Sequence, residues 1–293
     1  MMRIYIVFTG WEDRFRLGAE KYLDDNSIDS LYIFHGDYPS DKEVANRGDF
    51  IDYVKKKNIP FEVNKVPMAS PRDSWNVISS VIMDKFNAGD EVLLDISTMP
   101  REAIWYICNS INLSVGDIKV LYHCPEKYGE WTTEDPLDPR FPLKLSGVSD
   151  ISKKTFLIIA TGFDVARADQ IISFYDPDRI LFLIQNGKQF GNDLLNYEKH
   201  CKYAKQNGID IVDVNCYNLS ETYDVLEAYI VKYYSTHNFI LASLGPKLSA
   251  IPMFKMQKKF ENIALCYAPS KRINQDYSFG FSETYVEPFS LIN

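Results

Sequence analysis

A short stretch of the chain, LLDISTMPREAIWYI at residues 93–107, combines residue types that can bind or transform an anion. A buried-strand pattern ends at Asp95, and two hydroxyls (Ser97 and Thr98) and a cation (Arg101) follow directly. Hydroxyl and guanidinium groups donate hydrogen bonds to phosphate oxygens. A carboxylate at a strand end can act as an acid or a base, or hold a ribose hydroxyl. The spacing therefore predicts an anion site, with Asp95 as its candidate catalytic residue.

Each of these side chains also has a structural interpretation, which the sequence leaves open. Ser97 or Thr98 can cap the helix that Pro100 begins. Asp95 can be a hydrogen-bonded structural acid at the end of its strand. Arg101 can be a solvated cation, although a cation in a first helical turn opposes the helix dipole and costs on the order of 0.3–1 kcal/mol. That cost favours an anionic ligand or partner near Arg101.

The same kind of turn recurs in the second half of the chain, in the segment ILASLGPKLS. There Ser243 corresponds to Ser97, and Lys247 corresponds to Arg101. Each half also begins with an apolar run that ends in a Thr-Gly pair. These pairs are Thr9, Gly10, Thr161 and Gly162. A third match, VLYHCPEKY with ALCYAPSKR, follows in the same order, so we expect a duplicated unit of about 145 residues, near the commonest domain size.

The elements that must position these turns alternate between strands and helices. The strands expected from apolar runs lie at 3–9, 30–35, 60–66, 91–96, 118–123, 155–160, 179–184, 209–214, 238–243 and 262–267. The helices expected between them lie at 12–25, 42–58, 71–87, 100–113, 164–175, 193–207, 220–235 and 247–259. This alternation is typical of a parallel sheet covered on both faces. We expect an α/β fold of two tandem Rossmann-like domains with mostly parallel sheets, related by internal duplication.

The expected domain bounds follow from the repeat and from composition. The first Rossmann-like repeat is expected to span 1–128, and the second is expected to span 154–293. Segment 129–153 is rich in Pro, Asp and Ser, which is typical of a linker or an extended arm. The tract DYSFGFSETY near the C-terminus is expected to be a docking arm.

All the repeated polar turns follow the carboxyl ends of expected strands. Ligands of open parallel sheets bind beyond these ends, where helix N-termini supply N–H groups and a partial positive charge. The residues expected to bind a phosphate-bearing ligand are Thr9, Gly10, Ser97, Thr98, Arg101, Thr161, Gly162, Ser243 and Lys247. The two copies differ, because Asp95 stands where the second copy has Leu241. We therefore expect one principal site formed mostly by the first copy, where Arg101 contributes more to binding than Lys247.

Composition and charge restrict the class of protein. The chain has 293 residues, of which 46% are hydrophobic and 25% charged, and its net charge is −8. Such an acidic chain is not expected to bind duplex DNA, because phosphate neutralisation needs clustered Lys and Arg. The five cysteines and four histidines are dispersed without metal-ligand spacing, so no metal or other cofactor is expected.

The apolar runs argue against a membrane location. The start, MMRIYIVFTG, is expected to be a strand rather than a signal peptide, because its apolar run is short and no small-residue cleavage site follows. No run approaches the roughly 20 apolar residues of a membrane span. We therefore expect reduced, mostly buried cysteines in a cytoplasmic protein with no membrane association.

The layout of these motifs resembles CARF domains, the Rossmann-like sensors of cyclic oligonucleotides in prokaryotic defence. The residues that carry the resemblance are VFTG and LDISTMPRE in the first copy, and IATG and SLGPKLS in the second. The family's fourth-strand turn usually carries paired glycines before its cation, where this chain has STMPR and SLGPK. The resemblance implies a phosphate-bearing small molecule or a cyclic oligonucleotide as ligand, and it allows a protein partner or a homodimer.

Three functions remain open on the sequence alone. The first is a module that binds or senses a nucleotide-type ligand in a prokaryotic defence system. The second is an enzyme that acts on a nucleotide or phosphodiester, with Asp95 in its site. The third is a non-catalytic scaffold subunit.

Overall fold

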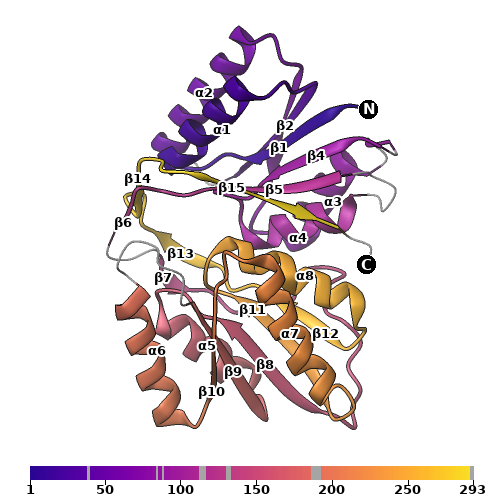
Figure 1. The fold of residues 1–293 in the computed structure, drawn as a ribbon, viewed down its shortest axis with the longest axis vertical. Helices are drawn as coiled ribbons and strands as arrows, with labels where there is room; N and C mark the ends of the chain where they lie inside the picture. Colours follow the sequence, from indigo (N-terminus) through magenta and orange to yellow (C-terminus); the bar gives the residue numbers. More distant parts are fainter. Residues whose placement is uncertain are drawn as a thin grey trace. The chain divides into compact units, whose positions relative to one another are not determined.

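The structure is a computed structural model, and its chain divides into two compact units. It describes residues 1–37, 40–83, 85–87, 89–111, 117–129, 133–185 and 193–290. Unit 1 contains Met1–Glu130 and Gln275–Asn293, and unit 2 contains Trp131–Asn274. Within each unit, helices alternate with the strands of one mostly parallel sheet (Figure 1). The expected α/β, Rossmann-like fold class is therefore confirmed.

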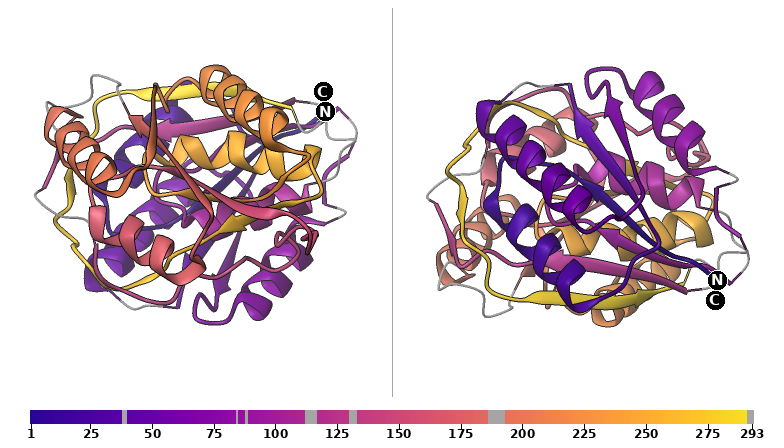
Figure 2. Two further views of the ribbon diagram at one scale, coloured as in Figure 1. Left: turned by 90° about the horizontal axis from the view of Figure 1, so that it is seen from below. Right: turned by 90° about the horizontal axis from the view of Figure 1, so that it is seen from above.

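Unit 1 is built on a six-stranded sheet in the order β15-β5-β4-β1-β2-β3. Its parallel strands are β1 (Arg3–Phe8), β2 (Ser30–Gly36), β3 (Phe61–Val66), β4 (Glu91–Asp95) and β5 (Asp117–His123). Its helices are α1 (Asp13–Asp25), α2 (Asp41–Lys56), α3 (Pro71–Ile82) and α4 (Arg101–Ser110). The pair α1 and α2 covers one face of the sheet, and the pair α3 and α4 covers the other (Figure 2).

Unit 2 is built on a five-stranded parallel sheet in the order β10-β9-β8-β11-β12. Its strands are β8 (Lys154–Ala160), β9 (Arg179–Gln185), β10 (Asp210–Val214), β11 (His237–Ser243) and β12 (Ile263–Cys266). Its helices are α5 (Val165–Tyr175), α6 (Asp193–Asn207), α7 (Leu219–Tyr233), the 3₁₀ helix η1 (Lys247–Ser249) and α8 (Ala250–Lys259). Counted along the chain, the five parallel strands of each unit share the order 3-2-1-4-5. This shared order supports the duplication, which stays a prediction.

Local sequence explains why these segments form where they do. Alternate residues of a strand face opposite sides of its sheet, so strands covered on both faces are apolar throughout. In β1, Tyr5 and Val7 pack with Phe15 of α1 and Phe50 of α2. Helix α3 begins as its sequence predicts, because Ser70 accepts a hydrogen bond from a first-turn amide and a proline occupies the first position.

The C-terminal residues differ from the expected domain bounds. The sequence predicts that the second repeat continues to residue 293, but 275–293 belong to unit 1. There β15 (Thr284–Phe289) pairs antiparallel with β5, and β14 (Ser278–Phe279) pairs with β6 (Lys127–Tyr128). The physical reason is that β5 would otherwise be an edge strand with unpaired backbone groups, which β15 pairs. The DYSFGFSETY tract thus forms β14 and the start of β15 within unit 1.

The described part of the expected linker packs along unit 2 as an extended arm. Strand β7 (Thr133–Pro136) pairs antiparallel with β13 (Ser270–Ile273). Farther on, Arg140 and Tyr267 exchange backbone hydrogen bonds, and the carbonyl of Leu145 accepts a bond from β12. These contacts account for the packing of the Pro-rich segment without a helix. No helix in the described part of the chain is long and apolar enough to cross a membrane.

Candidate functional site

The turns that follow β1 and β4 lie side by side in unit 1, because these strands are neighbours in the sheet. Val7 of β1 is in register with Asp95 of β4. Thr98 donates a hydrogen bond of 2.7 Å from Oγ1 to the carbonyl of Phe8. A Cβ on Gly10 would lie 2.8 Å from Cβ of Thr98, so only glycine allows this approach. The structure therefore brings together the Thr-Gly and Ser-Thr motifs that the sequence places far apart.

Helix α2 fixes the Thr-Gly turn from the other side. Thr9 is buried, and its Oγ1 donates a hydrogen bond of 2.7 Å to Oε1 of Glu43. Asn46 donates from Nδ2 to the carbonyls of Gly10 and Trp11, at 3.3 and 3.2 Å. These contacts hold the turn in one conformation, and they use the Thr9 hydroxyl proton within the protein.

Asp95 is almost completely buried, with only 1% of its surface exposed. Its carboxylate accepts hydrogen bonds from the Tyr5 hydroxyl, at 2.8 Å, and from both the amide and the hydroxyl of Ser97. It also lies 3.2 Å from Nε2 of His123. Burial alone would raise the pKa of Asp95, but its interactions with His123 and Ser97 outweigh burial and lower that pKa. This geometry supports the structural interpretation of Asp95 over the catalytic one.

His123 extends the Asp95 network to the C-terminal strand. Its Nδ1 lies 2.8 Å from the Thr284 hydroxyl of β15, and Thr284 is its partner in the register of β5 and β15. Its backbone amide donates to the Ser97 hydroxyl at 2.7 Å, and its ring packs edge-on against Phe281. Sequence reasoning missed these partners, because a single histidine at the end of an apolar strand carries no recognisable pattern.

The N-cap position of helix α4 is occupied by Pro100 and not by Ser97 or Thr98. Helix α4 begins at Arg101, and Pro100 makes no side-chain capping bond. Both hydroxyls donate their protons within the protein, that of Ser97 to Asp95 and that of Thr98 to a carbonyl of β1. These two bonds help to shape the turn between β4 and α4.

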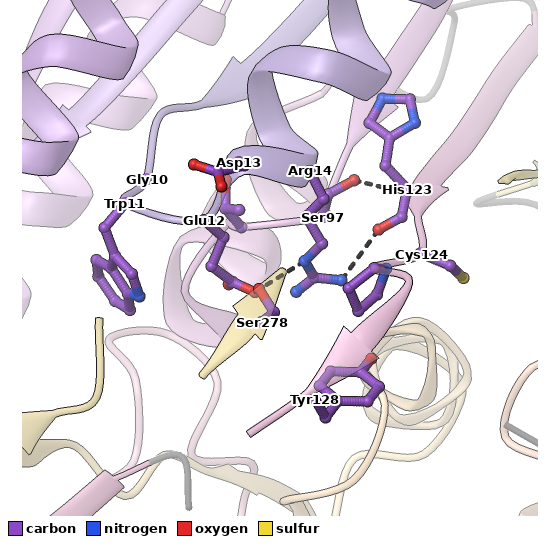
Figure 3. Close-up of polar contacts among 12 residues, drawn as sticks. Gly10, Trp11, Glu12, Asp13, Arg14, Ser97, His123, Cys124, Tyr128 and Ser278 are labelled. Carbon is purple, nitrogen blue, oxygen red and sulfur yellow. Dashed lines mark hydrogen bonds and ion pairs between the residues drawn. The ribbon is translucent and has the colours of Figure 1, made fainter. Parts of the chain in front are cut away.

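Arg14, which is buried, connects the loop after β1 to the end of β5 (Figure 3). The Nε atom of Arg14 lies 2.8 Å from Oε2 of Glu12, and its Nη1 donates to the carbonyl of His123 at 3.0 Å. Ser278 of β14 donates to the same Glu12 oxygen at 2.6 Å. Burial alone would lower the pKa of Arg14, but its interactions with Glu12, Tyr122 and Tyr128 together outweigh burial and raise that pKa. The ion pair thus fixes the loop and also holds the C-terminal segment.

The corresponding turns of unit 2 meet in the same way. A Cβ on Gly162 would overlap the carbonyl of Leu244, so the two turns again touch through a glycine. Thr161 is buried and donates from Oγ1 to a carbonyl of β9. The hydroxyls of Ser243 and Ser249 lie 2.8 Å apart and are also buried. In each unit the two turns therefore touch beyond the carboxyl ends of the strands. Most of the hydroxyls that shape these turns are buried, and that of Thr98 belongs to a partly exposed residue.

The two expected cations occupy equivalent positions. Arg101 is the first residue of α4, and Lys247 is the first residue of η1. The N-cap residues have nearly the same backbone, with φ −59° and ψ 140° at Pro100 and φ −52° and ψ 140° at Pro246. Both cations are partly buried. This local similarity supports the correspondence between the STMPR and SLGPK turns.

A further correspondence links residues of different types. His200 of α6 lies with Nε2 2.8 Å from the carbonyl of Gly162, as Asn46 of α2 donates to the carbonyl of Gly10. Each helix follows the second strand of its unit. Each side chain therefore holds the Thr-Gly turn of its unit through the glycine carbonyl. Because a carbonyl only accepts, His200 must donate from Nε2. Histidine and asparagine do not align as similar residues, so sequence comparison of the halves missed the pair.

We expect unit 2 to lose stability below pH 6.5 through His200. Burial lowers the pKa of His200 below its ordinary value of 6.5, so the unfolded chain binds the proton more readily. Stability is therefore complete above that value and falls as the pH drops through it, with a limiting slope of about 1.4 kcal/mol per pH unit. Urea denaturation at pH 7.5 and at pH 5 measures the loss. His200→Gln keeps an N–H donor without the titration, so a loss as large in this variant would contradict the assignment.

Among the described residues, no three His, Cys, Asp or Glu side chains gather in a way that could hold a metal ion. The five cysteines form no disulfide bond, and four of them are buried. Burial raises the pKa of Cys216 and of Cys266 to about 12, which makes both thiols poor nucleophiles. In each unit, the groups available at the turns are the turn backbone, one cation and the side chains around it.

No protein-family model and no curated protein matches the sequence. The fold is similar to that of a Type III CRISPR defence DNA nuclease activated by cyclic oligoadenylate, with a TM-score of 0.56 and 7% sequence identity. The match covers 86% of this chain and 63% of that chain, so this chain spans less than two thirds of the nuclease. A multidomain structure of a keto acid-selecting NRPS module matches with a TM-score of 0.21, which carries no argument. At such identities the likeness shows the fold alone.

Proposed function

We propose that the chain is a module that binds and senses a nucleotide-type, phosphate-bearing ligand in a prokaryotic defence system. One observation carries the proposal: in each unit, the Thr-Gly turn after the first strand touches the hydroxyl-proline-cation turn after the fourth strand. These strand ends are where open parallel sheets bind ligands. The similarity in fold to a nuclease activated by cyclic oligoadenylate makes cyclic oligoadenylates the first ligands to test.

The geometry divides the expected ligand-binding residues into two groups. The hydroxyls of Thr9, Ser97, Thr161 and Ser243 are buried, and those of Thr9 and Ser97 bond to carboxylates of the protein. We therefore assign them to shaping the turns. The glycines let the two turns of each unit touch. We assign the cations to contacting phosphate. A preformed turn loses little entropy on binding, which favours affinity.

We expect cyclic oligoadenylates to stabilise the protein, and the cations to be required. A ligand at 100 times its Kd should raise the free energy of unfolding by about 2.7 kcal/mol. Arg101→Ala should weaken binding by about 1 kcal/mol more than Lys247→Ala, because Arg can grip phosphate through two hydrogen bonds. Thermal shift and calorimetry on the two variants measure these effects. Lys55→Ala, which removes an exposed cation of α2, is the matched control and should bind like the wild type.

Two results would count against this proposal. If no nucleotide or cyclic oligonucleotide stabilises the wild type, the binding function fails. If Arg101→Ala and Lys247→Ala lose equal affinity, or two ligands bind per chain, the expected asymmetry of the site is wrong. In that second case the binding function stands, and both units contribute equally.

A further inference from the structure

An aromatic residue follows each Thr-Gly turn directly, as TGW in the first unit and TGF in the second. Trp11 and Phe163 each lie directly after the Thr-Gly turn of their own unit, which touches the turn after the fourth strand. Phe163 is 39% exposed and Trp11 is partly buried, whereas Trp75 and Trp105 lie in the core with 6% and 0% exposed. Trp11 and Phe163 are thus more accessible than the two core tryptophans.

The backbone that carries each ring is held in place. Asn46 bonds the carbonyl of Trp11, and Glu12, the next residue, pairs with the buried Arg14. In unit 2, Asp164 follows Phe163 and caps α5 by accepting hydrogen bonds from two first-turn amides. A ring on a fixed backbone loses little conformational freedom on binding, as in rigid aromatic anchors at protein interfaces.

The indole of Trp11 also has an unused donor. Its Nε1 is buried and has no hydrogen-bond partner among the described residues. The indole lies apart from the Glu12, Arg14 and Ser278 contacts (Figure 3). A buried tryptophan N–H usually finds a partner, so an acceptor atom on a ligand would complete this one.

We infer that Trp11 and Phe163 are base-stacking residues, so that the ligand carries unpaired nucleobases and is not recognised by phosphate alone. This inference rests on the proposed binding function, and it specifies that the site recognises the nucleobases of the ligand. Every nucleobase has a π-face that an aromatic side chain can stack against, and the indole N–H adds one hydrogen bond to a base or phosphate acceptor. The cations contact phosphate, and the aromatic residues contact bases.

Fluorescence and calorimetry on the full chain test this assignment, with cyclic tetra-adenylate and inorganic tripolyphosphate as probes. Cyclic tetra-adenylate should change the tryptophan emission of the wild type, and Trp11→Phe should lack this change. Trp11→Leu and Phe163→Leu should each weaken cyclic tetra-adenylate binding by about tenfold or more, and Trp11→Phe by less. Phe174→Leu, which changes an exposed ring of α5 outside the turn, is the matched control and should bind normally.

The outcomes separate this inference from the proposed function. If cyclic tetra-adenylate binds the wild type and both leucine variants equally, the base-stacking assignment fails and the binding function stands. If tripolyphosphate binds as tightly as cyclic tetra-adenylate, the site reads phosphate alone, and the assignment again fails by itself. If no base-bearing probe binds the wild type, both the assignment and the proposed function fail. Phe163→Leu keeps the test decisive if Trp11→Leu does not fold.

Discussion

Gly18→Ala in α1 should lower the free energy of unfolding by about 1–3 kcal/mol, although alanine is the better helix former. A Cβ at Gly18 would lie 2.7 Å from Cβ and from Cδ2 of His123, far inside ordinary contact. The His123 ring cannot easily retreat, because its nitrogens contact Asp95 and Thr284. The expected clash therefore outweighs the gain in helix propensity. Urea denaturation followed by circular dichroism measures the change.

Gly48 of α2 supplies the matched control for this substitution. It lies in a helix of the same unit, is exposed, and has no atom within 4 Å of the place where a Cβ would stand. Gly48→Ala should therefore raise the free energy of unfolding by about 0.5–1 kcal/mol. The two substitutions should shift the urea midpoint in opposite directions. A rise in both would show that α1 does not pack against His123 as described.

The strands and helices were accessible from sequence because hydrophobic periodicity is a local signal. In β4 every residue is buried, and its apolar run alone indicates a strand covered on both faces. The placement of the turns at one sheet edge followed from parallel topology. What sequence did not show was which strand would complete the sheet. Strand β15 joins β5 from the far end of the chain, and such pairing depends on an open edge rather than on local pattern.

The roles of side chains at the turns were harder to predict than their positions. Ser97 and Thr98 have the residue types of helix caps, and only the register of β1 and β4 shows that they bond elsewhere. His200 and Asn46 do one task with different chemistry, so alignment of the halves could not pair them. A side chain's partner is set by tertiary contact, which composition and spacing do not encode.

Asp95→Ala should destabilise unit 1 by about 3–5 kcal/mol, the expected cost of removing one member of a buried charged network. The substitution leaves the Tyr5 hydroxyl and the Ser97 amide and hydroxyl without their acceptor, and it leaves His123 without its partner carboxylate. Urea denaturation at pH 7 measures the loss. Asp52→Ala, which removes an exposed carboxylate of α2, should leave the midpoint nearly unchanged.

The pH dependence of Asp95→Asn separates the structural role of this residue from a catalytic one. Asparagine has the shape of aspartate, but its amide N–H₂ would face the groups of Tyr5 and Ser97 that donate hydrogen bonds. We therefore expect the free energy of unfolding to fall by about 1–3 kcal/mol at pH 7. The folded-state pKa of Asp95 is lowered, so its contribution is present above the ordinary pKa of 3.8 and is lost as the pH falls further. The stability gap between wild type and Asp95→Asn should therefore narrow at pH 3. If Asp95→Asn instead keeps full stability at pH 7 and abolishes turnover of a nucleotide, Asp95 is catalytic and the structural interpretation is wrong.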